Sequence, residues 1–377
     1  MREGFVERIE DATPRERDRA VDALRAVAIL GVVAGHWLVT ALVVESGGVR
    51  VASPLKDLPY LAPVSWVFQT LALFFLVGGL VGAKGYRSAR AAGIGYGRWL
   101  RSRLARLFRP VVAVTAVWAV AAVAMLASGV PLDTVRVLVR LVVGPMWFLL
   151  VFAALTAATP LVERLHPLWP LAVVACSDFL RFGPGEGLGW LWWVNVAAGW
   201  LVPYCLGAAW ARGALRGRVT GWALLAGGGA VAVALVMWGG YPATMVGVPG
   251  APMSNLDPPS LAAVTFGLAQ CGAAALLLAP LRRVLRRPAV WAVVAVANLA
   301  AMTIFLWHQT AMIAVTELGL LAGGGDRALP GLHTAPDGFG WVPARLAWLP
   351  VFAAALAVCC AAFHTHERGR GRRARTC

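Results

Sequence analysis

The chain has 377 residues, of which 59% are hydrophobic and only 14% are charged, and its formal net charge is +16. Soluble proteins carry about 25% charged residues. The composition therefore excludes an ordinary soluble enzyme, and repeated apolar runs of about 20 residues predict a polytopic helical membrane protein. The net charge alone would fit a nucleic-acid-binding protein, but the distribution of the charges argues against one.

We expect an all-α membrane protein with about ten transmembrane helices and both termini in the cytoplasm. A cytoplasmic N-terminal segment (1–21) precedes one transmembrane domain (22–363), and a basic cytoplasmic tail (364–377) follows it. The first residues are polar and resemble no cleavable signal peptide, so the first helix should act as a signal anchor. The predicted spans are 22–44, 60–83, 110–128, 144–162, 167–181, 190–211, 219–238, 259–280, 297–320 and 342–363.

The positive charges are distributed unevenly between the predicted loops. The segments assigned to the cytoplasm hold 26 of the 34 Lys and Arg residues, the outer segments hold seven, and the remaining one is Arg25. This asymmetry follows the positive-inside rule and supports cytoplasmic termini. The high pI therefore reflects topology and anionic membrane lipids, with no nucleic-acid partner, and the expected location is the plasma membrane.

The first predicted helix carries Asp22, Arg25 and His36 at membrane depth. Ionisable groups at that depth are costly and mark functional sites by default. The eleven residue steps from Arg25 to His36 leave a net rotation of about 20° and a rise of about 16 Å, and Asp22 neighbours Arg25 one turn earlier. All three side chains therefore share one stripe, with apolar Ile29 and Val32 between them.

His36 is our candidate general base, because histidine titrates nearest to neutral pH and could take a proton from an acceptor hydroxyl. A lone helical histidine is also often only a hydrogen-bonded packing residue. Asp22 could steer Arg25 or balance its charge, or it could simply cap the helix. We group Asp22, Arg25 and His36 as the candidate catalytic residues.

The segment 98–109 interleaves arginines with apolar residues. It could be an interfacial helix lying on anionic lipid. It could also be a clamp for a cytosolic polyphosphate ligand, because arginine forks pair well with phosphate oxygens. Both interpretations can hold for different arginines. The candidates for ligand binding are Arg101, Arg103 and Arg106, together with Arg25.

The remaining polar residues are less informative. His308 lies in the ninth predicted helix, followed by Gln309, and a packing role is as well supported there as a direct one. The six cysteines show no spacing typical of a metal site. Small apolar packing explains them, although an acyl-cysteine at Cys205 stays open. We therefore expect no metal.

Several motifs together resemble the membrane acyltransferase 3 family. The opening VDALRAVAILGVVAGHW matches the family's Arg, ten residues and His in the first helix, with an acid just before the Arg. The stretch RSRLARLFRP is similar to its R-x-x-R element, at Arg103 and Arg106. PMWFLLVF, with Trp147, is similar to the Trp-Phe-Leu signature, and IFLWHQ, with His308, to the Tyr-Leu-x-His element.

The resemblance implies an O-acyltransferase whose donor is acyl-CoA, commonly acetyl-CoA, entering from the cytoplasm. Arg25 would bind the donor's phosphates or orient the thioester, with Arg103 and Arg106 helping, and His36 would act at the thioester and the acceptor hydroxyl. Trp147 and His308 are candidate substrate-binding residues. The acceptor would be a carbohydrate, an exported glycan or a natural product.

Two other functions remain open from the sequence. In a transporter or flippase of a polar or lipid-linked substrate, Arg25 and His36 would line a path. No repeats or paired broken helices of the transporter kind are visible. A non-catalytic membrane sensor or scaffold would show no stabilisation by CoA, whereas a ligand that binds the folded state stabilises it.

Overall fold

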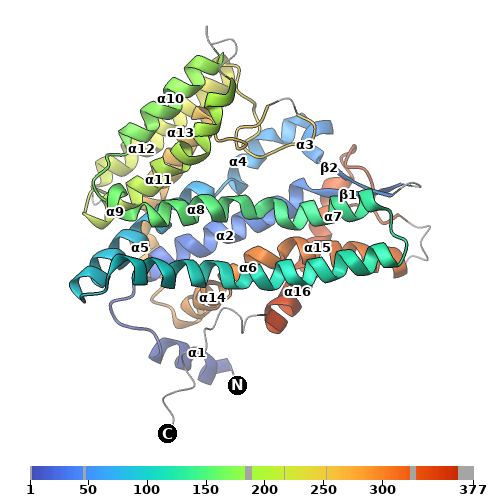
Figure 1. The fold of residues 1–377 in the computed structure, drawn as a ribbon, viewed down its shortest axis with the longest axis horizontal. Helices are drawn as coiled ribbons and strands as arrows, with labels where there is room; N and C mark the ends of the chain where they lie inside the picture. Colours follow the sequence, from blue (N-terminus) through green and yellow to red (C-terminus); the bar gives the residue numbers. More distant parts are fainter. Residues whose placement is uncertain are drawn as a thin grey trace.

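The computed structural model of the chain describes residues 2–45, 48–182, 189–215, 217–251, 253–322 and 328–363, and these are mostly helical (Figure 1). The helices and short 3-10 turns (η) are α1 (Arg2–Asp11), α2 (Arg19–Val39), α3 (Pro54–Asp57), η1 (Pro59–Val64), α4 (Ser65–Phe68), α5 (Leu71–Ala91), α6 (Tyr96–Ala127), α7 (Leu132–Val143), η2 (Gly144–Met146), α8 (Trp147–Ala157), α9 (Thr159–Val162), α10 (Leu168–Phe182), η3 (Gly189–Trp193), α11 (Val194–Ala211), α12 (Arg218–Trp238), α13 (Leu261–Val284), α14 (Pro288–Leu299), α15 (Ala301–Ala322) and α16 (Trp341–Phe363). The strands β1 (Ala41–Glu45) and β2 (Gly48–Ala52) form an antiparallel pair.

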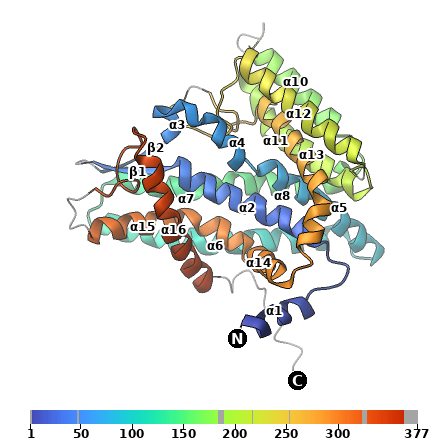
Figure 2. The same cartoon turned by 180° about the vertical axis from the view of Figure 1, so that it is seen from behind.

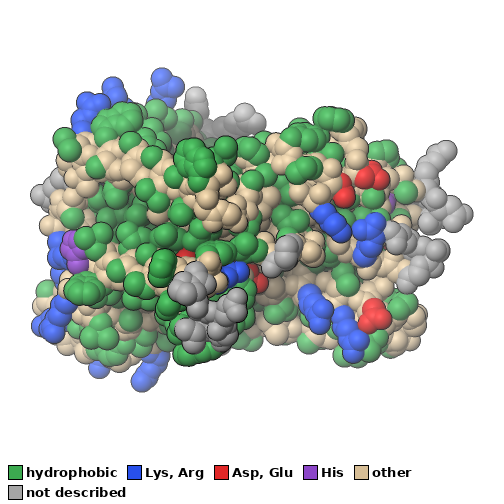
Figure 3. Space-filling model, turned by 90° about the horizontal axis from the view of Figure 1, so that it is seen from above, with side chains coloured by type: hydrophobic (Ala, Val, Ile, Leu, Met, Phe, Trp, Pro, Cys, Tyr) green, Lys and Arg blue, Asp and Glu red, His purple; other side chains and the backbone are tan. Residues whose placement is uncertain are grey.

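The predicted fold class, an all-α polytopic membrane protein, is confirmed. Within the described residues, nine helical segments are long and apolar enough to cross a membrane. The predicted span 167–181 corresponds to α10, which has 15 residues. A helix of that length measures about 22 Å, which is shorter than the roughly 30 Å hydrocarbon core. On the face drawn in Figure 3, most Lys and Arg side chains lie toward the two ends, and hydrophobic side chains dominate the zone between them.

The first predicted span, 22–44, is wrong at its C-terminal end. Helix α2 ends at Val39, and Thr40 is already extended. The run that follows is apolar enough to continue a transmembrane helix, but its β-branched residues instead pair with β2. The buried guanidinium of Arg345, on α16, donates to the carbonyls of Trp37 and Thr40 at 2.7 and 2.6 Å. It thereby satisfies carbonyls that the end of a helix leaves without an amide partner.

Three other differences from the predicted spans bear on the site. Helix α6 starts at Tyr96, so the arginine-rich segment 98–109 is the first part of one long helix and not a separate interfacial helix. In the structure the predicted span 144–162 begins earlier, at Leu132, because α7, η2 and α8 follow one another directly. The predicted span 60–83 contains a break at Gln69 and Thr70, between α4 and α5.

Helix α2 lies beside α5 and α15 in the centre of one helix group, and α10 to α13 form a second group (Figures 1 and 2). The two groups join where α5 packs against α11. At this contact a Cβ atom on Gly79 would lie 2.0 Å from the Tyr204 carbonyl oxygen, and one on Gly207 would lie 2.0 Å from that of Leu76. Small residues let membrane helices approach this closely. The close approach at Gly79 and at Gly207 therefore fixes α5, which borders the site, against α11.

Candidate active site

The stripe predicted on α2 connects two cavities. Arg25 and Ile29 line the first, which has a volume of about 400 Å³, and we call it the arginine cavity. Val32 and His36 line the second, of about 350 Å³, which we call the histidine cavity. The structure therefore places the two motif residues in different cavities, at separate levels of one helix.

Four arginines line the arginine cavity, from elements far apart in the sequence. Arg17 precedes α2, Arg25 belongs to α2, and Arg103 and Arg106 come from α6. Arg101, which we had grouped with them, is exposed and does not line this cavity. The rest of the wall is mostly apolar and comes from α2, α5, α6, α8, α14 and α15: Ile29, Phe74, Val77, Gly78, Val81, Gly82, Leu104, Leu107, Phe152, Thr156, Asn298, Leu299, Ala301 and Met302.

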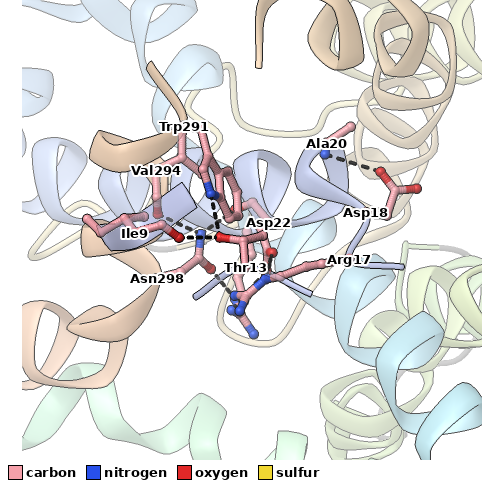
Figure 4. Close-up of polar contacts among 10 residues, drawn as sticks. Ile9, Thr13, Arg17, Asp18, Ala20, Asp22, Trp291, Val294 and Asn298 are labelled. Atoms are coloured by element: carbon pink, nitrogen blue, oxygen red, sulfur yellow. Dashed lines mark hydrogen bonds and ion pairs between the residues drawn. The ribbon is translucent and has the colours of Figure 1, made fainter. Parts of the chain in front are cut away.

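Arg25 is held by a polar network at the start of α2, and Figure 4 shows Arg17, Asp22 and Asn298 of this network. Its Nε donates to Asn298 Oδ1 at 2.5 Å, and its Nη2 lies 3.2 Å from Asp22 Oδ1. The other oxygen of Asp22 lies 2.5 Å from Nε of Arg17. Asn298 also donates to the Asp22 carbonyl at 2.7 Å. The helix N-cap is Asp18, so Asp22 instead links Arg17 and Arg25 and fixes how Arg25 faces the cavity.

The charges of this cavity are not balanced by the protein. Asp22 pairs with Arg17 and Arg25, whereas no carboxylate of the described residues forms an ion pair with Arg103 or Arg106. Arg103 is half-buried and packs against Gly85, where a Cβ atom would lie 2.2 Å from Nη2. Unpaired guanidinium groups in a partly closed cavity attract anions, and their planar forks match phosphate oxygens.

The histidine cavity combines aromatic, apolar and amide groups. Trp147 and Phe148 line it from α8. Its lining also includes Gln69, at the break between α4 and α5, and Gln309, on α15. Trp147, a predicted substrate-binding residue, is therefore in the same cavity as His36. Arg140 and Asp257 supply charges to its lining, and both side chains are exposed.

His308 lies behind His36 and is not part of either lining. The two imidazole ring centroids are 5.1 Å apart. His308 Nδ1 is 2.5 Å from the Phe305 carbonyl oxygen, and its backbone carbonyl accepts a hydrogen bond from the Trp37 indole at 2.9 Å. Its Nε2 is buried and, among the described residues, has no hydrogen-bond partner. His308 is thus placed to contact His36 and not a ligand in either cavity.

Two residues that hold α2 in place were not predicted from the sequence. Asn298 was visible only as a polar residue in an apolar stretch, and its contact with Arg25 crosses 273 positions. Arg345 was counted with the seven outer cations and stands at the start of the predicted span 342–363, yet its side chain is only 1% exposed and binds backbone oxygens at the end of α2. Cys205 is fully buried and lines neither cavity. In the part of the chain that the structure describes, no cluster of His, Cys, Asp and Glu could hold a metal ion.

The fold and the two cavities define a multi-pass membrane protein with a polar site enclosed by its helices. It belongs to the acyltransferase 3 family: the family's model, described as an acyltransferase domain, matches residues 18–364, nearly the whole chain. The protein is therefore a membrane acyltransferase, as the motifs predicted. No curated protein and no solved structure matched the chain in the corresponding comparisons.

Proposed function

We propose that this acyltransferase moves an acetyl group from cytosolic acetyl-CoA to a hydroxyl group of a carbohydrate, an exported glycan or a natural product. Its location is the plasma membrane, with both termini in the cytoplasm, in keeping with the distribution of Lys and Arg. The observation that carries the proposal is the pair of cavities on one face of α2, one lined by arginines and the other by His36.

The arginine cavity binds the donor. The diphosphate and 3′-phosphate of CoA are anions, and this cavity presents four guanidinium groups with a single carboxylate paired to two of them. The apolar wall beyond the arginines suits the pantetheine arm. The arm has to extend about 16 Å along α2 to bring the thioester from the level of Arg25 to that of His36.

His36 is the general base. Its imidazole takes the proton from the acceptor hydroxyl while the hydroxyl oxygen attacks the thioester carbonyl carbon. A carbon–oxygen bond forms, the carbon–sulfur bond breaks, and the CoA thiolate leaves and recovers the proton. Arg25 is held by Asp22 and Asn298, so its position is set before the donor arrives. Such preorganisation reduces the reorganisation needed during the reaction.

Donor binding is tested by CoA-dependent stabilisation of the purified full chain in lipid nanodiscs. A ligand at 100 times its Kd stabilises the folded state by about 2.7 kcal/mol. We expect CoA to raise the melting temperature, and the double variant Arg103→Gln/Arg106→Gln to lose this shift. Arg101→Gln is the matched control, because Arg101 lies on the same helix outside the cavity. Equal CoA shifts in the double variant and the control would refute donor binding at this site.

Transfer is tested in cells by mass spectrometry of glycans and small molecules with and without the gene. The expected difference is one acetyl group on one compound. His36→Ala should abolish that modification yet keep the CoA-dependent shift, whereas His166→Ala, at an exposed histidine, should keep both. Export of an unmodified compound in vesicles lacking acyl-CoA would instead establish a transporter.

A further inference from the structure

Helix α5 is preceded by a break in the middle of a membrane-crossing segment. The segment Pro59–Ala91 is long enough to span the bilayer, but Gln69 and Thr70 interrupt it between α4 and α5. Irregular backbone at membrane depth is tolerated where it is buried in protein or lines a cavity. Here it does both, because Gln69 and Thr70 line the histidine cavity and are 2% and 5% exposed.

The break fixes the orientation of the Gln69 amide. Its Oε1 accepts the Leu71 backbone N–H at 3.0 Å, so it caps the first turn of α5. Its backbone carbonyl accepts the side-chain amide of Gln270, and Thr70 Oγ1 donates to the Ala28 carbonyl at 2.7 Å. Because the Oε1 branch of the Gln69 amide faces the Leu71 N–H, the NH₂ branch points to the other side of the same amide. That Nε2 atom is buried and, within the described residues, has no hydrogen-bond partner.

A second unpartnered amide atom in the same lining comes from α15. Gln309 on α15 lines the same cavity, is 1% exposed, and carries an Oε1 atom without a partner among the described residues. Buried polar atoms of side chains are nearly always hydrogen-bonded, so each exception calls for an explanation. The two exceptions are complementary: Gln69 offers a donor and Gln309 offers an acceptor.

We propose that Gln69 and Gln309 form the binding site for the acceptor's hydroxyl groups and select a compound with adjacent hydroxyls. A hydroxyl both donates and accepts, so one hydroxyl accepts from Gln69 Nε2 while its neighbour donates to Gln309 Oε1. A protonated amine has no lone pair, so it cannot accept a hydrogen bond from the Gln69 NH₂ group. Trp147 and Phe148, in the same lining, offer apolar surface to the ring that carries the hydroxyls. This inference rests on the proposed function.

The test compares three acceptor probes with the same alkyl chain: octyl β-D-glucopyranoside below its micelle concentration, 1-octanol and octylamine. The full chain in nanodiscs receives acetyl-CoA, and acetylated products are quantified by mass spectrometry. We expect kcat/KM for the glucoside to exceed that for octanol at least tenfold, with no octylamine product. A site built to bond substrate hydroxyls rejects analogues that lack them more strongly than an apolar pocket rejects a missing methylene.

The variants Gln69→Met and Gln309→Met should each lower kcat/KM for the glucoside by tenfold or more. Octanol acetylation should change less than threefold, and the CoA-dependent melting shift should remain. Thr316→Val is the matched control on α15, because it removes a buried hydroxyl that bonds only within its own helix and lines neither cavity.

The outcomes separate the two proposals. If Gln69→Met and Gln309→Met lower kcat/KM equally for the glucoside and for octanol, the amides only shape the cavity, and the inference is overturned. It is also overturned if the wild-type protein prefers octanol, or binds CoA but acetylates none of the probes. Absence of both CoA stabilisation and acetyl transfer would instead refute the proposed function itself.

Discussion

Replacing Asn298 by Leu should weaken CoA binding by about 10- to 150-fold, because it removes the acceptor that orients Arg25. Asn298 Oδ1 accepts from Arg25 Nε at 2.5 Å. A hydrogen bond to a charged group contributes about 1.5–3 kcal/mol, and about 1.4 kcal/mol corresponds to a tenfold change in affinity. Arg25 would keep its contact with Asp22, so the effect should stay below that of removing Arg25 itself.

The same substitution also removes two bonds that have no part in binding. Asn298 Nδ2 donates to the Asp22 carbonyl at 2.7 Å and to the Val294 carbonyl at 3.0 Å. Each neutral hydrogen bond contributes about 1 kcal/mol, so Asn298→Leu should lower the free energy of unfolding by about 2 kcal/mol. Asn298→Asp separates the two effects, because it keeps an oxygen for Arg25 and loses the NH₂ group.

The assay is a CoA titration of the full chain in nanodiscs, with binding and melting temperature measured on the same samples. The affinity for CoA should decrease from the wild type to Asn298→Asp and then to Asn298→Leu. Arg101→Gln serves as the control and should bind CoA like the wild type. If Asn298→Leu is folded and binds CoA with unchanged affinity, Asn298 does not position Arg25 for the donor and the reasoning is refuted.

Three further predictions concern stability. Arg345→Met should cost about 3 kcal/mol or more in unfolding free energy, measured in denaturant, because the carbonyls of Trp37, Thr40 and Gly331 lose their donors. Gly207→Ala should abolish folding in a size-exclusion assay, since its Cβ would lie 2.0 Å from a backbone oxygen, whereas Gly227→Ala, with open space, should fold. Burial raises the pKa of Asp18, but its hydrogen bond and ion pair with Arg282 and its backbone bonds outweigh burial and leave that pKa below 3.8. The Asp18 contribution to stability is therefore present above about pH 4 and lost as the pH falls through the lowered pKa, so Asp18→Asn should flatten the acid melting curve.

The sequence predicted the class of protein and the stripe on α2 because both depend on local rules. Apolar run length predicts spans, and helix geometry places Arg25 and His36 on one face without knowledge of any neighbour. The same rules placed Arg103 and Arg106 in a basic segment, but they could not separate those two from Arg101. Which arginines face the cavity depends on how α6 packs against α5, α8 and α15, which is a tertiary property.

Residues whose role depends on distant partners could not be predicted in this way. Arg345 occurs at the start of a predicted span, where an arginine is ordinarily solvated or snorkels to the interface. Its burial depends on the chain turning into β1 after Val39, and the apolar run 40–44 gave no sign of that turn. Gln69 is similar, since its unpartnered amide follows from the helix break between α4 and α5, and two polar residues in an otherwise apolar run did not predict that break.

The aromatic rings that line the two cavities explain how an acetyl donor and an acceptor could be kept apart until they react. Phe74 lines the arginine cavity and Phe148 the histidine cavity, and their ring centroids are 5.3 Å apart. Phe148 in turn contacts Phe305 at 4.7 Å. Under the proposed function, these apolar rings surround the path of the thioester and exclude water from it. Water is the competing nucleophile, so its exclusion limits hydrolysis of the donor. The thioester then reacts with the acceptor hydroxyl beside His36.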